Sequence, residues 1–325
     1  MSILVTGGAG YIGSHMVLHL LEKGYDVVIV DDLSTGNKEA VLANRFYNAD
    51  LKDSKAMDKV FRENNIDGII HFAAYSLVGE SMQNPIKYYE NNVFGTLKIL
   101  QYMENYGVKN IVFSSTAAVY GEQPSPIKES ARTNPTNPYG ESKLSVEKML
   151  KWASKAYGIN YAALRYFNAA GSHESGRIGE KRKIETHLIP IALDVALGKI
   201  DKLLIFGDDY DTPDGTCIRD YIHVCDLVSA HLLALEKMQN SNSCALSMTY
   251  NLGSEKGFSV HQIVQAVKDV TKKDIRTEIA PRRKGDPAVL VASSEKIKKD
   301  LGWSPRYNDI HDIISTAWEY RKKLR

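Results

Sequence analysis

The stretch "ILVTGGAGYIGSH", residues 3–15, decides the fold of this chain. Its first apolar residues lead into glycines at positions 7, 10 and 13, and an amphipathic segment follows, which is the order of a strand, a tight turn and a helix. Gly7 allows the turn, Gly10 lets the backbone approach a pyrophosphate, and Gly13 lets the helix lie close to the strand. Because the N-terminus of such a helix attracts anions, the stretch predicts a dinucleotide-binding loop.

A carboxylate after the second strand completes this pattern. The apolar run Val27–Val30 ends in Asp31, about twenty residues beyond the glycines, where an acidic side chain binds the ribose diol of adenosine. Asp31 and Asp32 would repel a 2′-phosphate, and residues 31–36 contain no Arg or Lys. We therefore expect NAD as the cofactor in preference to NADP.

The first half of the chain continues to alternate strands and helices. Apolar runs at 68–72, 110–113 and 161–164 lie between amphipathic segments at 13–23, 85–106 and 139–157. Short apolar strands separated by helices favour a parallel sheet that is covered on both faces. The expected fold class is therefore α/β, a doubly wound parallel sheet of the Rossmann type that binds its ligands at the carboxyl ends of the strands.

The pattern changes after about residue 170. Residues 171–183 are rich in Gly, Ser and charged side chains, and the later segments are short and interrupted by Gly, Pro and Asp. We expect residues 1–170 to form the NAD-binding domain and residues 171–325 to form a smaller α/β lobe that binds the substrate. A segment near 224–254 is the candidate for a return to the first sheet.

Composition narrows the class of partner. The net charge of +2 gives no reason to expect nucleic acid or an anionic membrane. The cysteines, Cys217, Cys225 and Cys244, fit neither a metal spacing nor a disulfide framework, so we expect no metal and a reducing compartment. No basic leader precedes a long apolar region, and no apolar run approaches the roughly 20 residues that span a bilayer. We expect a soluble cytoplasmic protein with no membrane partner.

The stretch "NPYGESK", residues 137–143, carries the candidate chemistry. Pro138 suits the first turn of a helix and Asn137 suits its N-cap. Tyr139 and Lys143 are four residues apart and therefore share one helix face. A free phenol titrates near pH ~10, and a neighbouring ammonium lowers that pKa. We expect Tyr139 to be a base whose pKa Lys143 lowers.

Hydroxyl groups follow the apolar run at 110–113. Ser114-Ser115-Thr116 lies at the predicted carboxyl end of a strand, where hydroxyls meet ligands in parallel sheets. Thr116 is the candidate for a hydrogen bond to a substrate oxygen. The predicted catalytic residues are therefore Tyr139, Lys143 and Thr116.

Together these features resemble the extended form of the short-chain dehydrogenase/reductase superfamily. A series of further stretches resembles the UDP-glucose 4-epimerase family over nearly the whole chain, in the right order: "TGGAGYIGSH", "HFAAYSLVGES", "YYENNVFGTL", "FSSTAAVYGE", "NPYGESKL", "RYFNAAG", "GTCIRDYIHVCDL" and "APRRKGDPA". "GTCIRDYIHVCDL" is especially specific because it lies outside the NAD-binding half.

The resemblance implies a reaction and a set of residues. In that family the tyrosine removes the hydroxyl proton at sugar carbon 4 while a hydride passes to NAD⁺, and the 4-keto sugar turns over and takes the hydride back on its other face. Lys143 would also bind the nicotinamide ribose, Thr116 stands where many relatives carry serine, and Ser76 stands where some carry lysine. The cofactor contacts implied are Gly7, Gly10, Tyr11, Ile12, Gly13, Asp31, Asp32, Leu33, Ser34, Thr35, Gly36, Asp50, Leu51, Phe72, Ala73, Ala74, Ser76, Asn91, Ser114, Tyr139, Lys143 and Phe167.

The resemblance also implies a site for the UDP-sugar. An arginine fork suits phosphate oxygens, and a carboxylate suits ribose hydroxyls. Valine stands near the position where some relatives carry a bulky tyrosine, which leaves room for an acetamido group and suggests UDP-GlcNAc as a second substrate. The implied substrate contacts are Thr116, Tyr139, Asn168, His187, Leu204, Phe206, Arg219, Arg283, Asp286 and Val289.

Several alternatives are weighed on the same residues. A 4,6-dehydratase needs an acid–base pair after Thr116, where Ala117 and Ala118 stand instead. A UDP-glucuronate 4-epimerase, or another superfamily member that acts on nucleotide sugars, is the alternative enzyme, and the glucuronate reaction needs a basic group for the sugar carboxylate. A non-catalytic NAD-binding sensor or scaffold has no reason to combine Tyr139, Lys143 and Thr116.

The resemblance finally implies a homodimer. Its members pair through two helices on each subunit, for which residues 85–106 and 139–157 are the candidates. Val93, Leu97 and Leu100 have helical spacing on the first of these segments, although the same spacing suits packing on the chain's own sheet.

Overall fold

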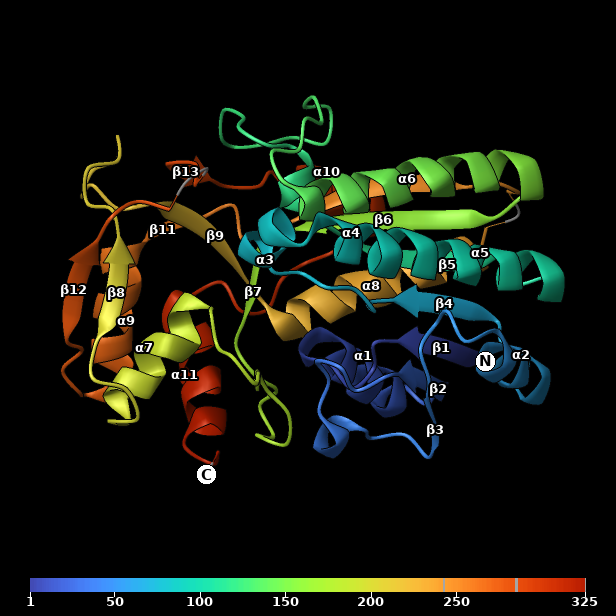
Figure 1. Ribbon diagram of the computed structural model, residues 1–325, viewed down its shortest axis with the longest axis horizontal. Coiled ribbons are helices and arrows are strands. Elements are labelled where there is room, and N and C mark those ends of the chain that lie inside the picture. Colours follow the sequence, from blue (N-terminus) through green and yellow to red (C-terminus); the bar gives the residue numbers. More distant parts are fainter. Residues whose placement is uncertain (242, 284–285, 325) are drawn as a thin grey trace.

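The computed structural model describes residues 1–241, 243–283 and 286–324. Its largest feature is a seven-stranded sheet in the order β10-β6-β5-β4-β1-β2-β3 (Figure 1). Every neighbouring pair in this sheet is parallel. The strands are β1 (Ser2–Thr6), β2 (Asp26–Asp31), β3 (Arg45–Asn48), β4 (Gly68–His71), β5 (Asn110–Thr116), β6 (Asn160–Tyr166) and β10 (Ser247–Leu252).

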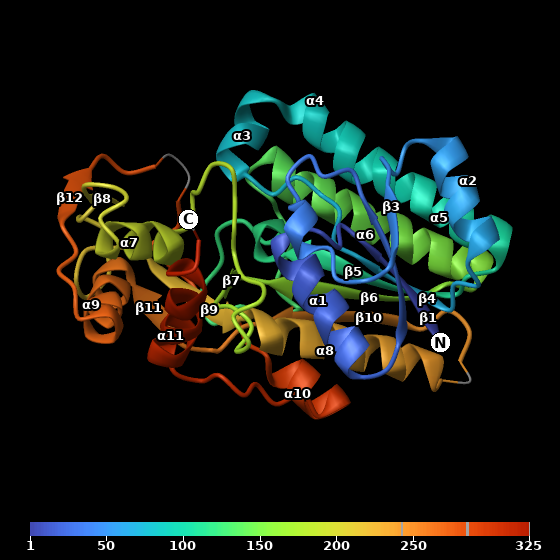
Figure 2. The ribbon, with the colours of Figure 1, turned by 90° about the horizontal axis from the view of Figure 1, so that it is seen from below.

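Helices cover both faces of this sheet, as Figure 2 shows. Side chains of β1 alternate between the two cores: Ile3 and Val5 pack on one face, and Leu4 packs on the other. Full burial of each such side chain stabilises the fold by about 1.5–3 kcal/mol. The first face is covered by α1 (Tyr11–Glu22), α8 (Val224–Gln239) and α10 (Glu295–Leu301), and the second by α2 (Ser54–Glu63), α5 (Gly95–Tyr106) and α6 (Pro138–Tyr157). The expected doubly wound α/β fold is confirmed.

The segment predicted as one helix over 85–106 is divided. Short helices α3 (Val78–Gln83) and α4 (Pro85–Tyr88) come first, then a π-helical segment over Tyr89–Phe94, and only then α5. In the π-helical segment Asn92 is buried, and its side chain hydrogen-bonds both main-chain groups of Tyr75, N–H and C=O, at 2.9 and 3.0 Å. A π-helical turn of this kind often marks a functional site.

The second part of the chain forms smaller sheets, drawn on the left of Figure 1. A four-stranded sheet contains β7 (Asn168–Ala170), β9 (Ile218–His223), β11 (Gly257–Ser259) and β13 (Val289–Leu290), and a two-stranded parallel sheet contains β8 (Leu203–Phe206) and β12 (Thr277–Ala280). Helices α7 (Leu188–Ala196), α9 (Val260–Thr271) and α11 (Ile310–Arg321) enclose a separate core.

The chain crosses between the two parts more than once. Strand β10 pairs with β6 at the edge of the large sheet, and α8 packs on that sheet, so both elements belong there structurally. Ile297 of α10 and Trp303 return to the same core. Residues after 170 therefore support the dinucleotide-binding sheet as well as the smaller lobe.

Two further findings concern the chain as a whole. Within the described ranges, no helix is both long and apolar enough to cross a membrane. The three cysteines are free thiols, and only Cys217 among them is buried.

Candidate active site

The glycine loop has the geometry that its sequence predicts. Gly7 has a φ of 71°, and a Cβ there would lie 2.7 Å from the main-chain nitrogen of Ala73. A Cβ on Gly13 would lie 2.0 Å from the oxygen of Gly7, so only glycine lets α1 approach the loop this closely. Gly10 is the N-cap of α1 and has no side chain to cap it, which leaves the first N–H groups of the helix for an anion.

Asp31 stands beside this loop at the end of β2. Its carboxylate accepts hydrogen bonds from the N–H groups of Ala9 and Leu33 at 2.9 and 2.8 Å, which fixes it against the glycine loop. Burial raises the pKa of Asp31, and these two hydrogen bonds oppose that rise. The position suits a carboxylate that accepts from ribose hydroxyls.

A lysine from a distant segment reaches the same region. Lys183 Nζ donates to the main-chain oxygen of Ser34 at 3.4 Å, and Asn37 donates to the oxygen of Lys181 at 2.8 Å. Lys183 thus brings to this loop a cation that residues 31–36 themselves do not contain. The carboxylates of Asp31 and Asp32 still set the charge at the end of the strand.

Helix α6 presents the predicted catalytic pair. Asn137 caps the helix by accepting from the N–H of Gly140 at 2.9 Å, and Pro138 occupies its first turn, as the sequence predicts. Tyr139 and Lys143 are both buried, with 9% and 3% exposure. Lys143 Nζ donates to the main-chain oxygen of Ser114 at 2.7 Å and lies 4.7 Å from the centre of the Phe113 ring. The helix thus places both side chains against the carboxyl end of β5.

The pKa of Tyr139 differs from the expectation. Burial raises it, while a hydrogen bond with Thr116 and the charge of Arg182 act in the opposite direction. Burial also lowers the pKa of Lys143 to about 7, and its Nζ is bound to the strand. In the protein without ligands, burial therefore sets the direction of both pKa shifts, and the lowering of the Tyr139 pKa by Lys143 stays a prediction.

Two side chains near Tyr139 are absent from the residues that the sequence predicts for the site. The hydroxyl of Tyr166, at the end of β6, is hydrogen-bonded to Ser114 Oγ, and the pKa of Tyr166 is raised by burial first and by the charge of Tyr139 second. Arg182 Nε donates to Glu180 at 2.8 Å, and its charge lowers the pKa of Tyr139. Tyr166 lies in the "RYFN" motif, so the sequence carried a signal that could have identified it. Arg182 lies in a loop that carries no such motif.

The remaining predicted cofactor residues follow the carboxyl ends of the strands. Phe72, Ala73, Ala74 and Ser76 come after β4, Phe167 follows β6, and Asp50 follows β3. Asn91 lies in the π-helical segment and donates to Asn92 at 3.1 Å. The side chain of Leu51 belongs to the core beneath the sheet, Phe167 belongs to a further buried cluster, and Phe72 and Ala73 pack against the cores.

The predicted substrate residues come from several strands of the second part. Asn168 of β7 pairs with Tyr221 of β9, and Val289 of β13 pairs with Ile218 of β9. Leu204 and Phe206 lie on β8. The guanidinium of Arg283 lies 4.0 Å from the centre of the Phe206 ring. Arg219 Nη2 of β9 lies 3.9 Å from the carboxylate of Asp286.

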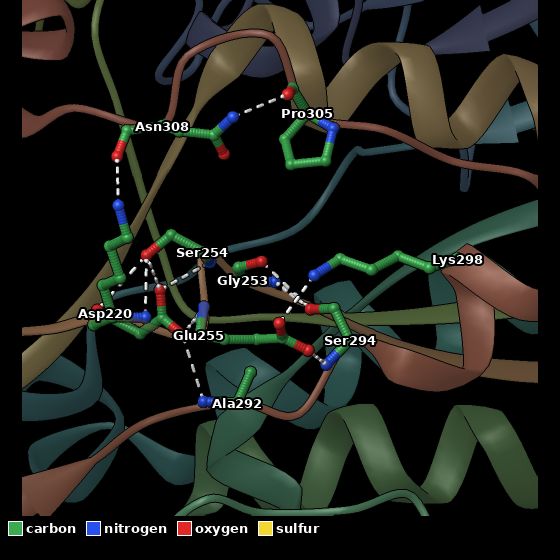
Figure 3. A network of polar contacts seen from close by, with 10 residues as sticks. Asp220, Gly253, Ser254, Glu255, Ala292, Ser294, Lys298, Pro305 and Asn308 are labelled. Atoms are coloured by element: carbon green, nitrogen blue, oxygen red, sulfur yellow. Dashed lines mark hydrogen bonds and ion pairs between the residues drawn. The ribbon is translucent and has the colours of Figure 1, made fainter.

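Strand β9 is held in place by the carboxylate of Asp220, the residue that follows Arg219 (Figure 3). Asp220 is fully buried and accepts from the N–H and Oγ of Ser254, both at 2.7 Å, and from the N–H groups of Glu255 and Ala292 at 3.2 and 3.1 Å. Burial raises its pKa to about 6. This carboxylate ties β9 to the loop after β10 and to the segment after β13, and so fixes the strand that carries Arg219. Lys284 and Gly285 of the "APRRKGDPA" stretch lie outside the described residues.

His187 takes part in an ion-pair network before α7. Its Nδ1 lies 2.7 Å from Glu180, which also binds Arg182. Glu185 lies 3.6 Å from Arg321, and the ligand atoms of Glu180, Glu185 and His187 lie within 4.8 Å of one another. The two arginines balance the carboxylates, so the arrangement is that of paired charges.

The glycine loop, Asp31 and the Tyr139–Lys143 pair at one edge of a parallel sheet define an NAD-binding enzyme of the short-chain dehydrogenase type. Residues 3–253 match the model of the NAD dependent epimerase/dehydratase family, and the chain belongs to that family. Within it, the chain is 54% identical to the UDP-glucose 4-epimerase of Halalkalibacterium halodurans, over 99% of this chain and 96% of the relative.

Solved structures give the same grouping. The crystal structure of the UDP-glucose 4-epimerase from Bifidobacterium longum in complex with NAD⁺ and UDP is 40% identical, has a TM-score of 0.94, and covers 99% of this chain and 98% of that one. The UDP-Glc/GlcNAc 4-epimerase of Campylobacter jejuni is 43% identical with a TM-score of 0.85, and 99% of each chain is covered.

Proposed function

We propose that this chain interconverts UDP-galactose and UDP-glucose by reversible oxidation at carbon 4 of the hexose, with NAD as the cofactor. The observation that carries the proposal is the burial of Tyr139 and Lys143 against the carboxyl end of β5, at the sheet edge where the glycine loop lies. The high identity to UDP-glucose 4-epimerases supports the same reaction.

Tyr139 and Thr116 act on the sugar oxygen. Bound NAD⁺ supplies the acceptor, and later the donor, of the hydride at carbon 4, and its positive charge favours the phenolate. The phenolate of Tyr139 takes the proton of the 4-hydroxyl, and Thr116 donates a hydrogen bond to that oxygen. After the 4-keto sugar has turned over, Tyr139 returns the proton as the hydride returns to the opposite face. Lys143 holds its charge next to the phenol throughout.

The second part of the chain binds the nucleotide. Arg219 and Arg283 provide planar forks for the two phosphates, and Asp286 accepts from ribose hydroxyls. The B. longum relative binds UDP, which supports a UDP site at these residues. We accordingly assign dinucleotide binding to residues 1–170 with the returning segment near 224–254, and UDP-sugar binding to the remainder of 171–325.

We also propose that UDP-GlcNAc is a substrate. Val289 is a partly exposed residue on β13, next to the strand that carries Arg219, and its side chain is smaller than a tyrosine at that place. The C. jejuni relative is a UDP-Glc/GlcNAc 4-epimerase, which supports room for an acetamido group in this family.

A homodimer is proposed from the outer helices. Leu100 is buried in the chain's own core and Val93 packs against that core, so of the three predicted positions only Leu97 is exposed. Ile86 and Trp152 are exposed by 76% and 67%, on α4 and α6. Exposed apolar side chains on adjacent helices are typical of a subunit interface. Light scattering is expected to give twice the chain mass.

We assign the protein to the cytoplasm, because its free thiols suit a reducing compartment.

One observation favours a second substrate class. Arg182 lies close enough to lower the pKa of Tyr139, and it is the basic group that a hexuronate carboxylate would need near the reacting carbon. UDP-glucuronate 4-epimerase activity is therefore the second candidate. Its expected signature is turnover of UDP-glucuronate that Arg182→Gln reduces by a much larger factor than it reduces UDP-galactose turnover.

The decisive experiment mixes the purified protein, NAD and UDP-galactose and measures UDP-glucose. The proposal predicts steady conversion to an equilibrium mixture. Binding of NAD and UDP without conversion of UDP-galactose, UDP-GlcNAc or UDP-glucuronate would contradict the proposal. That result would favour a sensor or scaffold.

A further inference from the structure

Helix α6 carries a third titratable side chain on the face of the catalytic pair. Tyr139, Lys143 and Glu147 are spaced by four residues each, so they follow one another along one face of the helix. Glu147 is buried, with 8% exposure. Burying a carboxylate costs free energy unless the group is paired and hydrogen-bonded. The buried position of Glu147 therefore needs an explanation.

Glu147 is paired with side chains of the neighbouring strands β5 and β6. Its Oε1 accepts from Ser115 Oγ at 2.5 Å and from Arg165 Nε at 2.9 Å, and its Oε2 accepts from Arg165 Nη2 at 2.5 Å. Arg165 Nη1 in turn donates to the hydroxyl of Tyr120 at 2.9 Å. The carboxylate is therefore fully bonded and held in one orientation.

The same strand end holds both Glu147 and Lys143. Ser115, which donates to Glu147, directly follows Ser114, whose main-chain oxygen accepts from Lys143 Nζ. A shift of Glu147 relative to β5 would therefore move the groups that set the position of the ammonium.

The other groups around Lys143 do not compensate its charge. From β4 comes His71, whose pKa burial lowers to about 3, with a smaller contribution from Lys143, so that it is neutral at working pH. From β5 comes the ring of Phe113, and from β6 come Tyr166 and Arg165. Arg165 is engaged with Glu147. Among the described residues, Glu147, one turn further along α6, is thus the anion whose charge acts on this ammonium.

We propose that Glu147 is a positioning residue for the epimerase reaction: it keeps Lys143 an ammonium ion and fixes it at the strand end where Tyr139 acts. The inference rests on the proposed function. A neutral lysine would not favour the phenolate, so the base would lose its partner just when it must be anionic.

The direction of the effect follows from the charges. Burial lowers the pKa of Lys143, and the charge of Glu147 raises it. Removal of Glu147 would let Lys143 lose its proton at lower pH. The alkaline limb of the kcat–pH profile is then expected to move to lower pH by about one unit, as expected for loss of one buried unit charge a helix turn away.

The test compares four variants in UDP-galactose turnover across the pH range, with thermal unfolding as the check on folding. Glu147→Gln would leave the guanidinium of Arg165 buried without its anion, so Glu147→Gln/Arg165→Gln, which removes the whole pair, is measured beside it. Glu147→Asp keeps the charge, and Ser115→Ala removes one hydrogen bond only. We expect the limb to shift in the two variants without the carboxylate and to stay near wild type in the other two.

A second readout does not depend on turnover. The pKa of Lys143 is measured by NMR in lysine-labelled protein without ligands, with Lys143→Met identifying its resonance. The expected result is a fall of about one unit in the double variant. The inference is overturned if the folded double variant keeps both the wild-type Lys143 pKa and the wild-type alkaline limb. It is also overturned if the alkaline limb of Glu147→Asp shifts as far as that of Glu147→Gln. Absence of turnover in the wild type would refute the proposed function instead, and the NMR titration would still decide the role of Glu147.

Discussion

The Nζ atom of Lys143 lies 2.7 Å from the main-chain oxygen of Ser114. The ammonium is thus anchored on β5, and its neighbour Tyr139 is also buried. In the protein without ligands, desolvation controls both groups: burial raises the pKa of Tyr139 and lowers that of Lys143. We expect the two groups to act as a base and its cation once bound ligands add their charges.

The burial of Lys143 predicts a specific dependence of stability on pH. Its pKa falls from 10.5 to about 7 on folding. Between these values the unfolded chain binds a proton that the folded chain lacks, so the free energy of unfolding rises with pH, by at most about 1.4 kcal/mol per unit from this group. Lys143→Met is expected to lose this part of the slope. Urea unfolding between about pH 7 and about pH 10 measures it, with Lys148→Met, exposed on the same helix, as the control. Identical slopes for wild type and Lys143→Met would show that the lysine is not desolvated.

Cofactor preference is expected to depend on opposing charges near Ser34. The wild type should bind NAD about a hundredfold more tightly than NADP, because Asp31 and Asp32 repel a 2′-phosphate. Asp31→Asn is expected to narrow that ratio. Lys183→Gln is expected to widen it, because Lys183 Nζ, 3.4 Å from the oxygen of Ser34, is the nearby cation. Calorimetric titration of each cofactor-free protein with NAD and with NADP gives the ratio of the two affinities. A wild type that prefers NADP would refute the role given to Asp31.

The wall of the sugar pocket is tested at Val289. Val289→Tyr is expected to cut kcat/KM for UDP-GlcNAc by about a hundredfold or more, because the larger ring would fill the space of the acetamido group, while UDP-galactose turnover changes only a few-fold. Val289→Thr has nearly the same shape and is the matched control. If the wild type converts UDP-galactose briskly and UDP-GlcNAc not at all, the second substrate is excluded.

Arg219 is expected to act in binding and not in the chemical step. Its guanidinium is mostly buried and lies 3.9 Å from Asp286, on a strand that Asp220 holds in place. Arg219→Gln should weaken UDP binding by roughly thirtyfold to a thousandfold, with a rise in KM and little change in kcat. Arg276→Gln removes an exposed arginine of the same lobe and should leave both constants unchanged. Unchanged UDP affinity in Arg219→Gln would move the diphosphate site elsewhere.

The features that sequence predicted well are those with a local cause. The glycine loop requires a positive φ at Gly7 and close contact at Gly13, and no other residue type meets both demands. Asn137 and Pro138 begin α6 for equally local reasons. By contrast, β3 over Arg45–Asn48 is partly exposed and lacks an apolar run, so it left no strand signal.

The missed parts of the site have causes that are distant in sequence. Arg182 and Lys183 approach Tyr139 and Ser34 from a loop whose path depends on the second lobe. The pKa of Tyr139 depends on how completely the fold excludes water from it, which no spacing of residues reveals. Sequence therefore identified the side chains that carry a local signal, and the structure was needed to show which distant side chains approach them and how the charges balance.

The central claim is that the phenolic oxygen of Tyr139 moves the proton of the sugar 4-hydroxyl. The most direct measurement is the rate of UDP-glucose formation from UDP-galactose by Tyr139→Phe, in protein shown by titration to bind NAD and UDP. Tyr157→Phe, half-exposed at the other end of α6, is the control. The account predicts a loss of roughly a thousandfold in kcat for Tyr139→Phe with both ligands still bound. Turnover of that variant within a few-fold of the wild type would contradict it.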